Sequence, residues 1–519
     1  MRAMYELDGS LKKIASGTAI GLLGVTFGLF LSFVARLVVA RYGLQANYGI
    51  FSMALAILNL AALLATLGLN QGAVRYIAYF RSRNDMAKVR ATVSNSIKLS
   101  SIASLVFCLV LFFAADVISQ GIFHTTDLIL PLRIFAVGIP FFTLILILLN
   151  ILRGFDQVAP MVIFQHITLN VLFLALLSGI GVFGLPFTTV FYAYLTAVIG
   201  TFIALLIYFT TRLRQQTSLK EAENAPPIIR ELLLFSLPLL GVVMSNMIIT
   251  WTDTLMLGYF KTPQVVGLYN AAYPLAQFIS EPLVAMRLIY TPVAAGLYAR
   301  HLMTDIRRSY TVSTKWLVFL TLPIFLMALL YPEAVLNIVF GSSYAPAALA
   351  LRILALGFIF SNFLGPNGAA LMAVGHSRFL MFTSLTAAVL NVVLNIVLIP
   401  PLGIAGAAIA TVASISLINV ARTIRLYSLY KIQPFTMNLL KPAIICVVLA
   451  IAVQFIARHF LNINWWLLIL VFVVFYGLYG IAALLSKSFD IEDIAVLLEI
   501  EKRSGINATP IKKLLRRFL

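Results

Sequence analysis

The sequence predicts an all-α polytopic membrane protein with about fourteen spanning helices. Of its 519 residues, 61% are hydrophobic and 11% are charged, whereas roughly a quarter of a soluble domain is charged. Long apolar runs recur along the whole chain, each close to the roughly 20 residues that a spanning helix needs. This composition excludes a single-span receptor, a membrane-anchored soluble enzyme and a nucleic-acid-binding protein.

The expected spans follow the apolar runs in chain order. The first six lie at residues 14–40, 48–70, 96–118, 129–152, 158–182 and 188–211. After a polar stretch at 212–231, eight more lie at 232–258, 265–293, 313–331, 347–372, 379–399, 404–424, 442–460 and 465–485. The remaining segment, 486–519, has the spacing of an amphipathic helix on the inner membrane surface near its end.

The positive charges predict the orientation in the membrane. If the first residues are cytoplasmic, thirty of the 37 Lys and Arg residues lie on the inner side and three on the outer side. Because Lys and Arg near span ends are retained in the cytoplasm during insertion, we expect a multi-pass protein of the cell (cytoplasmic) membrane. Both termini are expected on the cytoplasmic side. The four cations inside spans are Arg36, Arg133, Arg287 and Arg352.

Three tripeptides recur in order at nearly one offset and predict an internal repeat. The pairs are Leu132-Arg133-Ile134 with Leu351-Arg352-Ile353 at 219, Leu169-Asn170-Val171 with Leu390-Asn391-Val392 at 221, and Gly49-Ile50-Phe51 with Gly267-Leu268-Tyr269 at 218. Since the repeat holds an even number of spans, its two copies enter the membrane from the same side and are parallel.

We therefore expect two six-helix bundles around a central cleft. They occupy residues 1–211 and 232–425 and are joined by a cytoplasmic linker at 212–231. Two additional spanning helices at 442–485 and a cytoplasmic amphipathic tail at 486–519 lie outside the repeat.

Two arginines inside spans are candidates for substrate binding. A guanidinium binds phosphate through paired hydrogen bonds and keeps its charge, which suits a pyrophosphate or an acidic sugar in a cleft. Arg36 lies late in the first span with Ser32 one turn away, and Arg287 lies in the inner half of the eighth. For Arg287, contact with cytoplasmic lipid headgroups is an equally good interpretation.

Polar residues on two successive spans are candidates for a coupling-ion site. Asn246, Thr250 and Asp253 share one face of the seventh span, and Gln277 and Glu281 share a face of the eighth. Their oxygens suit H⁺ or Na⁺. The alternative is that these groups only hydrogen-bond between helices. No other cofactor is expected.

An enzymatic function is not expected. The five histidines are scattered without metal-ligand spacing, and no phosphate-binding loop motif occurs. A glycosyltransferase or polymerase would need a large outer loop or a cluster of catalytic carboxylates. The longest outer segment, about 332–346, carries one acid, Glu333.

Short segments around the spans resemble a known family. They are Ala40-Arg41-Tyr42-Gly43, Val74-Arg75-Tyr76-Ile77-Ala78, and Phe340-Gly341 before Leu351-Arg352-Ile353-Leu354. With the six-plus-six parallel repeats and two extra helices, they resemble the polysaccharide transporter branch of the multidrug/oligosaccharidyl-lipid/polysaccharide flippase superfamily. Its members include the Wzx-like oligosaccharide and O-antigen flippases. The resemblance covers nearly the whole chain.

The resemblance implies a MATE/MurJ-like fold and a substrate. Such proteins translocate a polyprenyl-pyrophosphate-linked oligosaccharide from the inner to the outer leaflet by alternating access, for surface glycan biosynthesis. The implied ligands are this lipid-linked oligosaccharide and membrane lipids, and the implied protein partners are glycan polymerases or glycosyltransferases. Arg36 and Asp253 are expected to face the cleft.

Two alternatives in the same superfamily are a cation-coupled multidrug exporter and a lipid II flippase. Arg36 favours an anionic substrate, whereas Asp253 and Glu281 favour a cation. Lipid II flippases carry cleft arginines on the first, second and eighth spans. Arg36 resembles the first, but Ala61-Ala62 and Ala272-Tyr273 stand at the other two positions, which disfavours lipid II.

Overall fold

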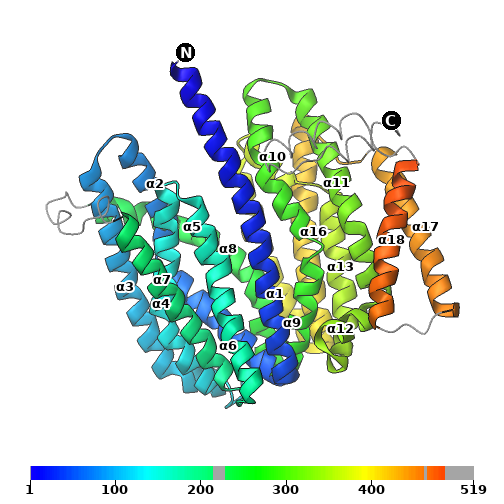
Figure 1. Ribbon diagram of the computed structural model, residues 1–519, viewed down its shortest axis with the longest axis horizontal. Helices are drawn as coiled ribbons and strands as arrows, with labels where there is room; N and C mark the ends of the chain where they lie inside the picture. Colours follow the sequence, from blue (N-terminus) through cyan, green and yellow to red (C-terminus); the bar gives the residue numbers. More distant parts are fainter. Residues whose placement is uncertain (1, 214–227, 436, 461–464, 486–519) are drawn as a thin grey trace. The chain divides into compact units, whose positions relative to one another are not determined.

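The computed structural model describes residues 2–213, 228–435, 437–460 and 465–485, and within these ranges the chain is helical with no strand. It consists of two compact units, Met1–Gly267 and Leu268–Leu519 (Figure 1). Most of the predicted linker at 212–231 and the whole predicted tail at 486–519 lie outside the described residues. The all-α polytopic fold expected from the sequence is confirmed.

The helices of the first unit cover the first seven predicted spans. They are α1 (Arg2–Ala65), α2 (Leu69–Ser82), α3 (Met86–Asp116), η1 (Val117–Ile122), α4 (Ile129–Gly154), α5 (Val158–Val162), η2 (Ile163–Thr168), α6 (Leu169–Phe183), α7 (Thr189–Leu213) and α8 (Ile229–Phe260). The helix α9 (Pro263–Gln277) begins in this unit and continues into the second.

The second unit carries the remaining helices. They are α10 (Glu281–Ala299), α11 (Met303–Leu330), α12 (Pro332–Phe340), η4 (Ser342–Ala347), α13 (Ala348–Phe363), α14 (Asn367–Ala373), α15 (Ser377–Leu402), α16 (Ile404–Tyr430), α17 (Met437–Phe460) and α18 (Trp465–Leu485). In Figure 1, α17 and α18 stand beside α11, against which both pack.

Each predicted span has a helix. Among the described residues, ten helices are long and apolar enough to cross a membrane, or eleven when the bent α8 is included. The first two predicted spans share α1, and the last two correspond to α17 and α18. In lipid, all backbone polar groups need internal partners, and a continuous helix supplies them within one segment.

A break at Leu44 divides α1 into two helices. The φ of 56° and ψ of −170° at Leu44 are non-helical, so the helix is kinked at this residue. The Tyr42 hydroxyl donates to the Leu185 carbonyl, and a Cβ on Gly43 would overlap the Phe187 ring. The Arg41-Tyr42-Gly43 segment therefore fixes this kink against the loop between α6 and α7.

Each repeat contains an ion pair between an arginine and an acid at equivalent positions. Arg133 Nη2 lies 2.7 Å from Asp116 Oδ2 in the first unit, and Arg352 Nη2 lies 3.1 Å from Glu333 Oε1 in the second. The arginines are 219 residues apart and the acids 217, which agrees with the offset found in the sequence. These arginines hold neighbouring helices together and keep their charge paired near the span ends.

A side-chain bond to the second span is also duplicated. Thr143 Oγ1 of α4 donates to the Ala62 carbonyl at 3.3 Å, just before α1 ends. Its repeat equivalent, Asn362 of α13, donates from Nδ2 to the Ile279 carbonyl at 2.7 Å, in the break between α9 and α10. The fourth span of each repeat thus binds the backbone of the second span at or near its interruption.

Two glycines at repeat-equivalent positions make a reciprocal contact. A Cβ on Gly49 would overlap the carbonyl of Pro263, and a Cβ on Gly267 would overlap the carbonyl of Gln45. Beside them, Gln264 Nε2 donates to Gln45 Oε1 at 2.7 Å. The starts of the two helices therefore approach so closely that only glycine fits at either position.

Replacing Gly49 or Gly267 by alanine should destabilise the protein by about 1–3 kcal/mol, because the added methyl group forces the backbones apart. Thermal unfolding of the purified protein in detergent measures the effect. Gly296→Ala in α10 is the matched control, since its Cβ would meet nothing within 4 Å. The unfolding temperature of Gly296→Ala should equal or exceed that of the wild type. Equal behaviour of the three variants would show that the contact contributes nothing.

Candidate substrate and ion sites

Arg36 lies in α1 beside two buried tyrosines of the first unit. Its charge interacts with the hydroxyls of Tyr48 and Tyr194, which are 1% and 7% exposed. Tyr194 is fixed by aromatic packing, with ring centroids 5.8 Å from Phe51 and 5.2 Å from Phe173. Arg36 as a residue is half-buried.

Ser32 precedes Arg36 by one helical turn and is also half-buried. Its position on the same face of α1 agrees with the predicted shared environment. Ser32 and Arg36 thus stay the predicted phosphate-binding residues of the first bundle.

Asp253 is buried on α8, with 1% of its surface exposed. Its neighbour Thr254 is 2% exposed, whereas Thr250 lies on an exposed part of the same helix. Asn246 lies where α8 bends by 51°, between Ser245 and Met247, and its side chain is outside the described residues. A carboxylate this deep in an apolar segment is costly, which makes Asp253 a candidate for binding a cation. The cavity expected to join it to Arg36 stays a prediction.

The eighth predicted span is broken between Gln277 and Glu281. Residues 278–280 form a turn, α9 ends before it and α10 begins after it. Gln277 Nε2 donates to Glu281 Oε1 at 3.0 Å across the turn. The Glu281 carboxylate lies in the first turn of α10, where it is favoured by the helix dipole. This geometry gives both residues a structural role at the break, in addition to the predicted role in ion binding.

A group of buried amides around this break was not anticipated from the sequence. Asn362 Nδ2 bonds both the Ile279 carbonyl and, at 3.1 Å, Thr321 Oγ1. Asn367 Nδ2 bonds the Asn419 carbonyl at 3.2 Å. The Oδ1 atoms of Asn362 and Asn367 are buried and have no partner among the described residues. Asparagines inside apolar runs were the available signal for this group.

Arg287 and Arg422 lie close together in the second unit. Arg287 is on α10 and Arg422 on α16, both half-buried, and their charges repel each other. Arg422 lies two residues before the end of the predicted span 404–424 and was counted with the cytoplasmic charges that follow it. In the structure α16 continues to Tyr430, which places Arg422 about two turns inside the helix. Arg422 is therefore a second cation beside Arg287 that was not among the four cations expected inside spans.

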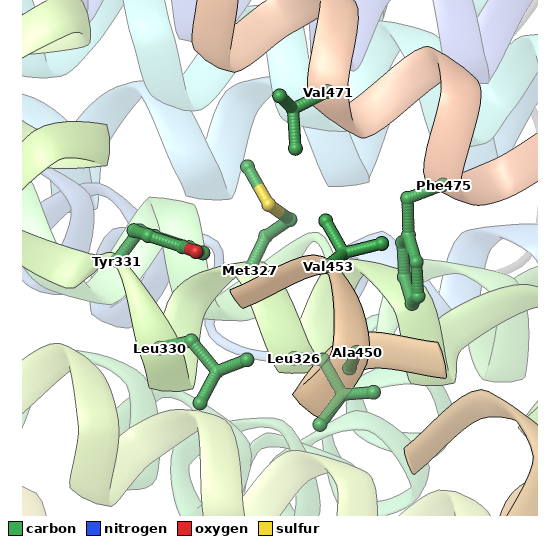
Figure 2. A pocket seen from close by; sticks show the side chains of 8 residues that line it. All are labelled: Leu326, Met327, Leu330, Tyr331, Ala450, Val453, Val471 and Phe475. Atoms are coloured by element: carbon green, nitrogen blue, oxygen red, sulfur yellow. The ribbon is translucent and has the colours of Figure 1, made fainter. Parts of the chain in front are cut away.

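No metal cluster is found in the part of the chain that the structure describes. No three His, Cys, Asp or Glu side chains gather there as metal ligands. A groove between α11, α17 and α18 is lined by aliphatic and aromatic side chains (Figure 2). Its lining residues are Leu326, Met327, Leu330, Tyr331, Ala450, Val453, Val471 and Phe475. Without a charged residue, this groove is unsuited to a phosphate or a coupling ion.

Comparison with protein families decides where the chain belongs. The model of the family described as polysaccharide biosynthesis protein matches residues 14–293, more than half of the chain. The chain belongs to the polysaccharide biosynthesis protein family. The MatE family model also matches, over residues 238–397.

Curated relatives of this chain are distant in sequence. An uncharacterized membrane protein of Methanocaldococcus jannaschii is 24% identical, over 77% of this chain and 81% of that protein. Stage V sporulation protein B of Bacillus subtilis is 23% identical, over 78% and 80%. The probable low-salt glycan biosynthesis flippase Agl15 of Haloferax volcanii is 27% identical, over 31% of this chain and 34% of that protein.

Solved structures share the fold of this chain. The lipid II flippase MurJ in an inward closed conformation has a TM-score of 0.67 at 14% identity, covering 88% of this chain and 97% of that one. An inward-facing multidrug resistance MATE family transporter has a TM-score of 0.65 at 17% identity, covering 80% and 99%. The MATE/MurJ-like fold and the family expected from the sequence are thus confirmed.

The amide of Asn362 is expected to stabilise the interrupted eighth span. Asn362→Leu should lower the free energy of unfolding by about 1–3 kcal/mol, because it leaves the Ile279 carbonyl and Thr321 without their donor. Thermal unfolding in detergent measures it. Asn150→Leu is the control, since the Asn150 amide bonds only Leu146 of its own helix. A loss of stability no larger than that of Asn150→Leu would contradict a stabilising role for Asn362.

Proposed function

We propose that the protein is a flippase for a polyprenyl-pyrophosphate-linked oligosaccharide. It moves this lipid from the inner to the outer leaflet of the cell membrane by alternating access, for the biosynthesis of a surface glycan. Family membership over residues 14–293 and the similarity to a glycan biosynthesis flippase support this proposal. The transporter fold provides the architecture for such a movement.

The observation that carries the choice of substrate is the placement of Arg36. A guanidinium never loses its charge at physiological pH, and it binds phosphate oxygens through paired hydrogen bonds. Arg36 is half-buried beside Tyr48 and Tyr194, whose hydroxyls add donors and acceptors without adding negative charge. Such a site favours an anionic group over a cationic drug. In this proposal Arg36 and Ser32 bind the pyrophosphate in the first bundle, and Arg287 binds it in the second.

The second candidate function is a cation-coupled multidrug exporter. The MatE family model covers residues 238–397, a range that includes the buried Asp253 and the half-buried Glu281. A buried carboxylate is what a cationic cargo needs. The same residues fit the first proposal when they bind a coupling H⁺ or Na⁺ while the arginines bind the lipid phosphate. A lipid II flippase remains the third alternative.

Arg36→Ala should reduce outer-leaflet exposure of the lipid-linked glycan at least tenfold while leaving its synthesis intact, because one charge-assisted pair of hydrogen bonds is lost. Surface labelling of the glycan, with total lipid-linked glycan measured in parallel, separates transport from synthesis. Arg83→Ala, an exposed arginine that stacks on Tyr79, is the control and should behave like the wild type. Normal surface glycan in Arg36→Ala would remove Arg36 from the mechanism. A change in drug resistance alone would favour the exporter.

Asp253→Asn should abolish the response of transport to an ion gradient, since the amide keeps the shape of the carboxylate but has no charge. Vesicles carrying the purified protein are given a proton or sodium gradient, and the rate of glycan-lipid translocation is measured with each. The exposed Asp305→Asn is the control. If Asp253→Asn follows both gradients as the wild type does, Asp253 does not bind the coupling ion.

A further inference from the structure

Arg287 and Arg422 occupy equivalent places on two helices that meet the same core cluster. Tyr290 of α10 and Leu426 of α16 both belong to a buried cluster that includes Ala369, Ala370 and Leu371 of α14. Arg287 precedes Tyr290 by three residues, and Arg422 precedes Leu426 by four. Spans eight and twelve are predicted to cross the membrane in the same direction. Each arginine therefore lies about one helical turn from the cluster, and both are displaced toward the same side of the membrane.

Hydrogen bonds from α15 hold the Arg422 guanidinium in place. Its Nε donates to Thr383 Oγ1 at 3.1 Å, and its Nη2 donates to Ser384 Oγ at 2.8 Å and to the Leu380 carbonyl at 3.4 Å. Its Nη1 points toward α14, where a Cβ on Gly368 would lie 3.6 Å away. No described residue accepts a hydrogen bond from Nη1. The guanidinium is therefore oriented in advance with one edge available.

Arg287 is a second cation whose charge is not neutralised by any described carboxylate. Its Nε is buried and has no hydrogen-bond partner among the described residues. Neither Arg287 nor Arg422 forms an ion pair with any described carboxylate, and their two charges repel each other. Like charges within spanning segments are costly unless something neutralises them. An anion between the two side chains would reverse this repulsion and occupy the available donors.

We propose that Arg287 and Arg422 form a binding site for the phosphate group of a lipid. Planar guanidinium groups match phosphate oxygens in pairs, and two of them suit a group with two negative charges. The hydroxyls of Thr383 and Ser384 orient Arg422 and carry no charge that would oppose the anion. The lipid is either the polyprenyl pyrophosphate of the transported substrate or a phospholipid of the bilayer. Assignment to the substrate rests on the proposed function, whereas the phosphate site itself does not.

Lipid binding to the purified full-length protein tests this site. Native mass spectrometry in detergent measures the affinity for geranylgeranyl pyrophosphate, for phosphatidylglycerol and for the zwitterionic phosphatidylcholine. Arg287→Gln and Arg422→Gln should each weaken binding of the preferred anionic lipid about tenfold or more, because each removes charge-assisted hydrogen bonds. Arg425→Gln is the matched control, an exposed arginine of the same helix that lies over the Phe379 ring. It should bind as the wild type does.

Several controls keep each outcome decisive. Thermal unfolding shows whether the glutamine variants are folded. If they are not folded, Arg287→Lys and Arg422→Lys, which preserve the charge, are measured in their place. A preference for geranylgeranyl pyrophosphate that depends on both arginines assigns the site to the substrate. Equal binding of phosphatidylglycerol with the same dependence assigns it to a bilayer lipid. The site would be overturned if Arg287→Gln, Arg422→Gln, Arg287→Lys and Arg422→Lys all bound the anionic lipids as the wild type does. The flippase proposal would then still rest on the Arg36 experiment.

Discussion

The need to satisfy every backbone hydrogen bond inside the membrane governs this structure. Continuous helices meet it within one segment, but the eighth span is interrupted at residues 278–280. Asn362 binds the Ile279 carbonyl there, and Thr143 binds the Ala62 carbonyl at the equivalent place in the first repeat. Polar side chains in the fourth span of each repeat therefore permit an irregular second span. Irregular spans of this kind are where transporters commonly place ligands and ions.

Charges within spans fall into two groups with different physical roles. Arg133 and Arg352 are paired with Asp116 and Glu333, so their charge is neutralised and they join helices. Arg36 and Arg287 have no ion pair among the described residues, and they remain available to an external anion. The ion pairs thus separate two arginines that join helices from two that stay candidates for binding an anion.

Hydropathy and internal offsets were sufficient to predict the fold, because each spanning helix needs a long apolar run and both repeats retain it. Several parts of the sites depended on three-dimensional packing instead. Arg422 lies two residues before the expected end of the twelfth span at 424 and was interpreted as a cytoplasmic charge, although α16 continues to Tyr430. The interruption after Gln277 was also hidden, since the residues on both sides of it are apolar enough for one helix. The amide of Asn362 became meaningful only once its partner, Ile279, was placed beside it.

The contact between Gly49 and Pro263 is repeated between Gly267 and Gln45, with every residue exchanged for its equivalent 218 positions away. Such an exchange is the property of an isologous interface, in which the same surface meets itself across a two-fold axis. A single copy of the repeat carries both the glycine and the carbonyl that receives it. The contact therefore depends equally on both helix starts, and neither glycine can be exchanged for a larger residue without moving the backbone of the other repeat.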